Sequence, residues 1–120
     1  SGPAGISMQP ESRAFLWDAH RAAVLIATFL DGKEWADYAE DAMLRSAVER
    51  QFEIVGEALN RLARGDRDVA SQIEDLPRIV AFRNVRIHGY VTIDDAIVWQ
   101  VASDRIGSLT DLLAGLLGGT

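Results

Sequence analysis

The positions of three prolines constrain the fold of this chain more than any other feature of its sequence. They stand at 3, 10 and 77 in a chain of 120 residues. Because proline lacks a backbone N–H and breaks the interior of a helix, the proline-free stretch 11–76 is free to form long helices. No segment alternates polar and apolar residues convincingly, and no Asn-Gly or Asp-Gly turn joins two β-branched runs. These features predict an all-α fold.

The spacing of the apolar residues defines the predicted helices. In the first helix, Phe15, Ala19, Ala22, Ile26 and Phe29 recur at intervals of three or four and form one face. The predicted helices span about 10–30, 35–64 with a possible break near Glu40, a short 66–73, 77–88 and 94–117. Together they predict an antiparallel up-and-down helical bundle of four main helices plus a short fifth helix.

Residues with special roles at helix ends support these boundaries. Gly32 is a natural residue to follow the end of the first helix, and Thr92 with Asp95 three positions later predicts the start of the last one. The opening residues 1–7, "SGPAGIS", are expected to be an expression-tag remnant, with Met8 as the native start. Residues 8–120 are then expected to form a single helical domain around one core.

The overall composition excludes several classes of protein. A net charge of −6 argues against a surface that binds nucleic acid over its whole extent, because such a surface needs an excess of Lys and Arg. The absence of cysteine removes disulfides, zinc-thiolate sites and cysteine nucleophiles, and it suits a reducing cytoplasm, which is the expected location. The longest apolar run, 22–30, is much shorter than the roughly 20 residues of a membrane span.

Against this acidic background, the stretch "AFRNVRIHGY" at 81–90 is basic. Between 77 and 88 the chain carries Arg78, Arg83, Arg86 and His88 and no Asp or Glu. Arginine binds phosphate through a bidentate fork that lysine cannot offer. The apolar residues of the same segment supply packing that would anchor the helix and leave its polar edge facing a cleft. We therefore expect a local phosphate site on an acidic body.

Cleavage of the RNA backbone needs Arg and His close together without requiring a metal. The 2′-hydroxyl must lose a proton and the leaving 5′-oxygen must gain one, and an imidazole with a reference pKa of about 6.5 can serve either step. A fixed guanidinium stabilises the charge that develops on the phosphoryl oxygens. DNA lacks the internal 2′-nucleophile, so DNA is not an expected substrate.

Helical geometry limits how such a site can be built. Residues five apart on a straight helix differ by about 140° and about 7.5 Å in rise, so Arg83 and His88 do not share a face. Asn84 and His88, which are four apart, do share one. A long arginine side chain, a distorted helix end before Gly89 or a second subunit is needed to close the site. A symmetric dimer that places two such helices together is the most economical solution.

The segment fits the pattern R-x4-H-x-Y, with Arg83, His88 and Tyr90 at the defined positions and Asn84 directly after the arginine. This pattern resembles the signature of the HEPN superfamily (higher eukaryote and prokaryote nucleotide-binding domains), in its HepT-like toxin branch. The stretches 45–62 and 93–109 resemble the long second helix and the final helix of that branch. The likeness covers nearly the whole chain after Met8.

The resemblance implies properties that spacing alone does not. Members of the family are dimeric, metal-independent RNases that act as toxins without a cofactor, and an antitoxin of the minimal nucleotidyltransferase (MNT) type is their partner. That antitoxin transfers AMP onto the motif tyrosine, here Tyr90. An adenylyl group at this position would place an anionic phosphate beside Arg83, where the phosphate of RNA would otherwise bind. Arg83 and His88 are then the expected catalytic residues, with Asn84 and Arg86 supporting them.

Simpler interpretations remain open for each of these residues. Arg83 and His88 could form an ordinary surface edge whose arginine pairs with an acid elsewhere, and the domain could be a non-catalytic nucleotide-binding or scaffold module for a nucleotidyltransferase, or a generic interaction bundle. Glu57 is expected to pair with an arginine, and His20 to have no function. The remaining interpretations are of Trp17, Trp35 and Trp99 as core or dimer anchors, and of the acid-rich 34–41 as a solvated face.

Overall fold

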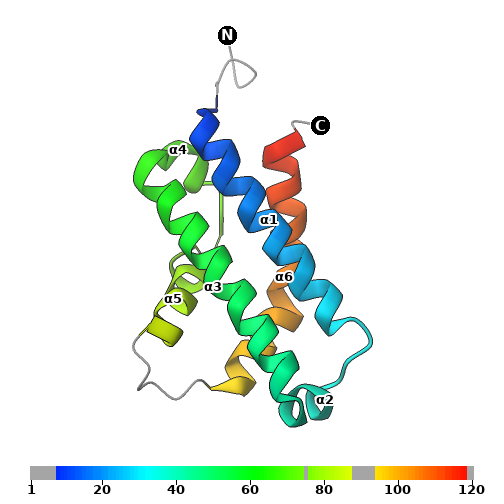
Figure 1. The fold of residues 1–120 in the computed structure, drawn as a ribbon. Coiled ribbons are helices and arrows are strands. Elements are labelled where there is room, and N and C mark those ends of the chain that lie inside the picture. Colours follow the sequence, from blue (N-terminus) through cyan, green and yellow to red (C-terminus); the bar gives the residue numbers. More distant parts are fainter. Residues whose placement is uncertain (1–7, 75, 88–93, 119–120) are drawn as a thin grey trace.

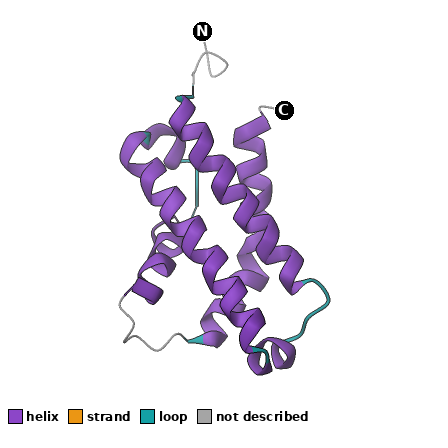
Figure 2. Cartoon of the chain, viewed as in Figure 1, coloured by secondary structure: helices purple, strands orange, loops and turns teal. Residues whose placement is uncertain are grey.

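The computed structural model of the protein describes residues 8–74, 76–87 and 94–118, and within them it contains helices and loops but no strand (Figure 2). The all-α prediction is therefore confirmed. The helices are α1 (Pro10–Leu30), α2 (Trp35–Glu40), α3 (Ala42–Gly65), α4 (Arg67–Ala70), α5 (Leu76–Ile87) and α6 (Asp95–Gly118).

The longer helices run alternately up and down (Figure 1). Helix α1 packs against α3 on one side and α6 on the other, and α5 packs against the far side of α3. The predicted count of five helices is not confirmed, because the described residues form six. The long second helix is divided at Asp41 into α2 and α3, close to the break considered at Glu40.

Acidic side chains explain why the chain divides there. Glu34 and Asp37 form a reciprocal capping box at the start of α2, and the Asp41 carboxylate accepts the backbone N–H of Leu44 at 3.0 Å. Such caps satisfy N–H groups that have no partner inside the helix. The guanidinium of Arg45 donates to the carbonyls of Tyr38 and Ala39 at the other side of the break. The break between α2 and α3 is thus stabilised by the cap at the start of α3 and by the contacts of Arg45 with the end of α2.

The core lies between α1, α3 and α6. The apolar stripe predicted for α3 is buried except at its first member, Leu44, which is half-buried; its buried members are Val48, Phe52, Val55, Leu59 and Leu62. The inward face of α1 carries small residues together with Leu16 and Ile26. Full burial of a Leu or Ile side chain stabilises the fold by about 1.5–3 kcal/mol. Among the described residues, most of this burial comes from these three helices.

A buried polar contact fixes the start of α1 to the turn between α3 and α4. The hydroxyl of Ser12, only 3% exposed, donates to the Asp66 carboxylate at 2.8 Å. The same carboxylate accepts the backbone N–H of Val69 at 3.2 Å and so caps α4. One side chain therefore orients two helices.

The ends of α1 and α6 test the predicted caps. Gly32 follows α1 with a φ of 74°, which glycine adopts without strain, as predicted. Thr92, the expected cap of the last helix, lies outside the described residues. Asp94 caps α6 instead, since its carboxylate accepts the N–H groups of Ala96 at 3.0 Å and Ile97 at 3.3 Å. An aspartate directly before the first turn competes well with a more distant threonine.

Candidate active site on helix α5

Helix α5 is held to the bundle through its first turn. Ile79 is buried, and Leu76 and Val80 are half-buried against the core. Arg78 and Ala81, on the other side of the helix, are exposed. The helix therefore packs on α3 with one face, as the alternation of apolar and polar residues in this segment requires.

The predicted site residues occupy the end of α5 and the segment that follows it. Arg83, Asn84 and Arg86 lie on the last turns of α5, and the structure describes their backbone but not their side chains. His88 and Tyr90 lie outside the described residues. The approach of Arg83 to His88, and any modification of Tyr90, stay predictions.

The register of α5 places its two later arginines relative to the packed face. Arg83 follows Ile79 by four residues and Arg86 follows it by seven, and positions with these spacings lie on one side of a helix. The face that begins with buried Ile79 therefore continues, toward the end of α5, into positions occupied by arginine. This face changes from apolar to cationic along a single helix.

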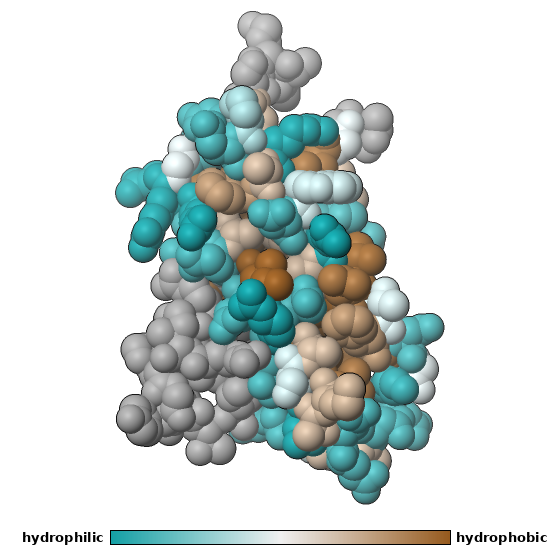
Figure 3. Space-filling model, viewed as in Figure 1, coloured by the Kyte–Doolittle hydropathy of each residue, from teal (hydrophilic) through white to brown (hydrophobic). Residues whose placement is uncertain are grey.

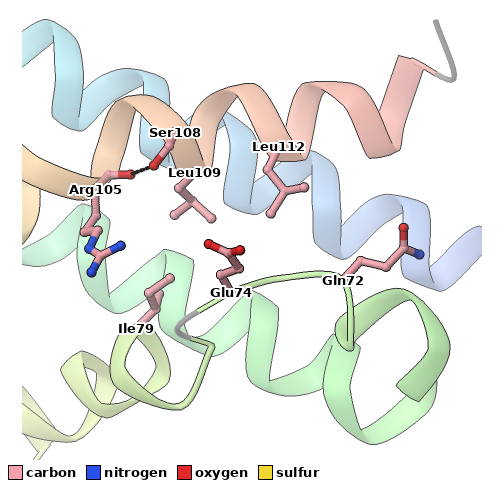
Figure 4. A pocket seen from close by; sticks show the side chains of 7 residues that line it. All are labelled: Gln72, Glu74, Ile79, Arg105, Ser108, Leu109 and Leu112. Atoms are coloured by element: carbon pink, nitrogen blue, oxygen red, sulfur yellow. Dashed lines mark hydrogen bonds between the residues drawn. The ribbon is translucent and has the colours of Figure 1, made fainter.

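A hollow opens beside the first turn of α5, between it and α6 (Figure 4). Its apolar wall is formed by Ile79, Leu109 and Leu112, and Glu74 and Arg105 also line it, with the Glu74 carboxylate pointing toward the two leucines. Its volume of about 220 Å³ is below the roughly 300–1,000 Å³ of small-molecule sites. The hollow by itself is too small for a nucleotide.

Elsewhere on the acidic body, some of the arginines are paired with acids of the described chain. Ion pairs join Arg45 to Asp95 (Nε–Oδ2 3.5 Å), Arg61 to Glu57 (Nε–Oε2 3.1 Å) and Arg50 to Glu53. The prediction that Glu57 pairs with an arginine is confirmed. The pairs of Arg61 and Arg50 each join two residues of α3 that are three or four positions apart. Opposite charges at such spacings attract each other modestly.

Sequence reasoning missed one unusual residue inside the acid-rich segment 34–41. The acids there are exposed, as predicted, but Tyr38 is completely buried, and its ring packs 5.5 Å from that of Trp99. Burial, and secondarily the carboxylates of Glu49 and Asp95, raise the pKa of Tyr38 well above its usual value, although Arg45 opposes the shift. Its hydroxyl has no hydrogen-bond partner among the described residues. The spacing Trp35–Tyr38 was the available signal for an inward aromatic face.

The tryptophans do not behave alike. Trp99 is half-buried and lies near Trp35, with their ring centroids 6.4 Å apart, so these two contribute to the aromatic cluster around Tyr38. Trp17 is 59% exposed and is not a core residue. Its ring lies parallel to that of half-buried His20, with centroids 6.3 Å apart.

Two features are absent from the described part of the chain. Within 8–74, 76–87 and 94–118, no three His, Asp or Glu residues cluster as metal ligands would. None of the helices in this part of the chain has the length and apolar character needed to cross a membrane.

Comparison with known proteins places these features in a family. A helical bundle whose short α5 leads into an Arg-x4-His segment is the arrangement expected of a HEPN-type ribonuclease. The family described as "Ribonuclease HepT-like" matches residues 19–115, and the chain belongs to this family. No solved structure matches.

Individual relatives agree with this assignment. The chain is 28% identical over 96 residues to "Putative RNase MJ1380" of Methanocaldococcus jannaschii, covering 78% of this chain and 85% of that protein. It is 30% identical over 78 residues to "Putative RNase TTE0752" of Caldanaerobacter subterraneus subsp. tengcongensis, covering 65% of this chain and 69% of that protein. The similarity therefore extends over most of each chain.

Proposed function

We propose that this protein is a metal-independent endoribonuclease and the toxin of a toxin–antitoxin pair in the cytoplasm. The observation that carries the proposal is the Arg83-x4-His88 segment at the end of α5, in a chain that belongs to the ribonuclease HepT-like family. The relatives named above bear the name RNase, which supports RNA as the substrate.

In the proposed reaction, the ribose 2′-hydroxyl attacks the adjacent phosphorus and the bond from phosphorus to the 5′-oxygen breaks. His88 accepts the 2′-proton or donates a proton to the departing 5′-oxygen. Arg83 stabilises the charge that builds on the phosphoryl oxygens, and Arg86 adds positive charge nearby. Asn84, on the same helical face as His88, orients that imidazole. The products are a 2′,3′-cyclic phosphate, or the 3′-phosphate after its hydrolysis, and a 5′-hydroxyl.

A homodimer completes this site. Arg83 and His88 are five residues apart, which separates their directions by about 140° on a straight helix. Two copies that bring their α5 ends together would supply Arg from one chain and His from the other, and would pool their positive charge. The packing of Leu76, Ile79 and Val80, in the first turns of α5, against the core supports this arrangement, because it anchors the start of the helix whose end carries Arg83.

The proposed control is AMP transfer to Tyr90 by an MNT-type nucleotidyltransferase antitoxin. The Tyr90 oxygen attacks the α-phosphorus of ATP, pyrophosphate leaves, and the phenolic proton passes to a base of the transferase. The phosphate added two residues from His88 would occupy the position of the RNA phosphate and bind Arg83. Modification would therefore inhibit the toxin by competition with its substrate.

The experiment incubates purified protein with structured and unstructured RNA in EDTA and analyses the ends of the products. We expect cleavage that leaves cyclic phosphate or 3′-phosphate ends, and loss of this cleavage in His88→Ala. Arg78→Ala is the matched control, since Arg78 is an exposed arginine on the first turn of α5. Full activity of His88→Ala would contradict the proposal.

Expression in cells separates the toxin from a non-catalytic module. A toxin arrests growth when it is produced alone, and Arg83→Ala and His88→Ala relieve the arrest. A module that only binds nucleotide or a nucleotidyltransferase would form a tight complex with that partner and leave growth unchanged. The intact mass after co-expression with the transferase reports on Tyr90, because each AMP adds a fixed increment and Tyr90→Phe removes it.

A further inference from the structure

The outward surface along which α1 and α6 pack, here called the α1–α6 seam, carries two hollows. Figure 3 shows brown, hydrophobic side chains gathered over the part of the molecule where these two helices run together. The first hollow is lined by Pro10, Arg13, Ala14, Trp17, His20, Ala114, Leu117 and Gly118. The second is lined by Val24, Ala27, Thr28, Asp31, Gly107, Thr110 and Asp111. No residue of α5 lines either one.

The first hollow has a large aromatic side chain at its edge. Trp17 is 59% exposed, although burial of a tryptophan removes more apolar surface from water than burial of most other side chains. Arg13 and Arg21 lie four residues before and after it and are also exposed. Neither arginine forms an ion pair with a residue of the described chain. The end of the seam at the start of α1 is therefore aromatic and positively charged.

The second hollow is open and has a largely apolar floor. Its α1 wall is Val24, Ala27 and Thr28, and a Cβ added to Gly107 on the opposite wall would meet no atom within 4 Å. The hydroxyl of Thr28 donates to the Val24 carbonyl at 2.8 Å, and that of Thr110 donates to the Ile106 carbonyl at 2.7 Å. Because these hydroxyls have partners in their own helices, the hollow can accept an apolar group at little cost in lost hydrogen bonds.

The charges along the seam are opposite at its two ends. Exposed Asp31 and Asp111 lie at the second hollow, and neither forms an ion pair within the described residues. Arg13 and Asp31 are 18 residues apart on or next to one helix, which corresponds to about 27 Å. A nucleic acid or an anionic membrane lying along the seam would meet the arginines at one end but would be repelled by the aspartates at the other. The seam is complementary to itself in the antiparallel direction.

We propose that a second copy of this chain docks on the α1–α6 seam, related by a two-fold axis that passes near Val24. Trp17 of each copy inserts into the second hollow of the other, and Arg13 and Arg21 of each copy approach the partner's Asp31 and Asp111. Such an isologous contact uses the same surface twice, so every favourable pair occurs twice. A tryptophan that fills a pocket of the partner, with arginines beside it on its own chain, is the kind of contact that dominates binding energy at interfaces.

This interface is separate from pairing through the ends of α5. It stands whether or not the protein cleaves RNA, because none of its residues belongs to the proposed catalytic site. If both contacts form, each copy has two different two-fold neighbours, and the assembly grows to a tetramer or beyond.

The first test compares sedimentation equilibrium of the wild type with Trp17→Ala and with the control Met43→Ala, which removes an 84% exposed apolar side chain on α3. We expect Trp17→Ala to raise the dissociation constant at least about thirtyfold, and Met43→Ala to leave it unchanged. Equal dissociation constants for Trp17→Ala and wild type would overturn the proposal, as would a monomeric wild type at high micromolar concentration.

Charge reversal tests the orientation. Arg13→Asp and Asp31→Arg should each weaken association, and the double variant should restore it, because the reversed pair is again opposite in sign. Arg64→Asp, at an exposed position near the end of α3, is the control for net charge. Failure of the double variant to recover would refute the antiparallel arrangement.

Cysteine cross-linking locates the axis. The chain has no cysteine, so Val24→Cys introduces a single thiol near the proposed two-fold axis, and oxidation should join two copies. Ser46→Cys, exposed on α3, is the control and should not cross-link. Absence of a Val24→Cys dimer would overturn the proposal. So would a Trp17→Ala variant that loses affinity for single-stranded RNA while its oligomeric mass is unchanged, since the seam would then bind RNA.

Discussion

Helices α3 and α5 lie side by side but distribute their apolar and charged residues in opposite ways. Helix α3 has 24 residues, buries a stripe from Val48 to Leu62, and pairs Arg50 and Arg61 with glutamates of its own sequence. Helix α5 has 12 residues, is anchored around Ile79, and has no acid among its residues. Arg50 and Arg61 are thus neutralised by acids within α3, whereas α5 has no acid of its own to pair with its arginines.

The difference assigns a long stretch of the buried core to α3 and the proposed active site to the neighbouring helix α5. Truncation of any large residue in the buried stripe of α3 should lower the free energy of unfolding by several kcal/mol, at about 2–5 kcal/mol for Leu→Ala. On α5, the buried residue among the described side chains 76–81 is Ile79, and we expect that the arginines of the later turns can be replaced without weakening the core. The comparison predicts that substitutions on α3 change stability with little effect on intrinsic activity, and substitutions late on α5 do the reverse.

The largest expected effect is on activity. Arg83→Ala should lower the rate of RNA cleavage about 10²–10³-fold, because loss of one donor to the developing phosphoryl charge costs this much in comparable sites. The cleavage rate of Arg83→Lys should lie between those of Arg83→Ala and the wild type, since lysine keeps the charge but not the bidentate fork. Single-turnover cleavage assays measure the rates, and thermal unfolding should show a melting temperature close to that of the wild type. A large drop in the melting temperature would show that Arg83 stabilises the fold, and would contradict a purely catalytic role.

The corresponding substitution on α3 is Leu59→Ala, at a fully buried position. It should lower the free energy of unfolding by about 3 kcal/mol, from lost burial and the cavity left behind. Urea denaturation measures the loss. The cleavage rate per folded molecule should remain near the wild-type rate at low temperature. A loss of activity equal to that of Arg83→Ala would contradict the division of roles between α3 and α5.

A smaller effect is expected at the turn after α3. Asp66→Ala removes the cap of α4 and leaves the buried Ser12 hydroxyl without its acceptor. The free energy of unfolding should fall by about 1–2 kcal/mol. Asp68→Ala, at an exposed position in the same short helix, is the control and should cost much less. Equal losses in the two variants would mean that the Ser12 contact is unimportant.

Tyr38 gives a dependence on alkaline pH. Its pKa is raised in the folded protein, chiefly by burial, whereas in the unfolded chain it titrates near the usual value of about 10. Above that pH the unfolded chain loses the phenolic proton first, so wild-type stability falls as pH rises. At pH 7, the free energy of unfolding of Tyr38→Phe should be within about 1 kcal/mol of the wild-type value, since the hydroxyl has no hydrogen-bond partner in the described part of the chain. The variant should also lose less stability between pH 9 and 11. Parallel stability curves for the two proteins would contradict the shift.

The smallest effect concerns charge pairing on α3. Glu57→Gln breaks the exposed pair with Arg61 and should change the free energy of unfolding by less than about 0.5 kcal/mol. The difference should shrink further in high salt because the pair is screened. A loss above 1 kcal/mol, measured by urea denaturation, would show that α3 depends on its charges as well as on its apolar stripe.

The sequence by itself determined the helices and the core. Apolar spacing depends on neighbours within a few turns, so the ranges of α1 and α6 and the buried stripe from Val48 to Leu62 could be predicted. The motif that carries Arg83, His88 and Tyr90 could also be found from the sequence. Its proposed function needs Arg83 and His88 to approach each other, which the geometry of a straight helix does not bring about by itself.

Only the tertiary structure decided how the faces of these helices are used. Periodicity identifies an apolar face but not the helix that will cover it, which is why Tyr38 is buried within an acid-rich segment and Trp17 is exposed. The burial of Tyr38 depends on Trp99, which is far away in the chain, and no local pattern encodes that contact. The caps at Asp41 and Asp94 differ from it, because each of these carboxylates accepts an N–H group only two or three residues further along.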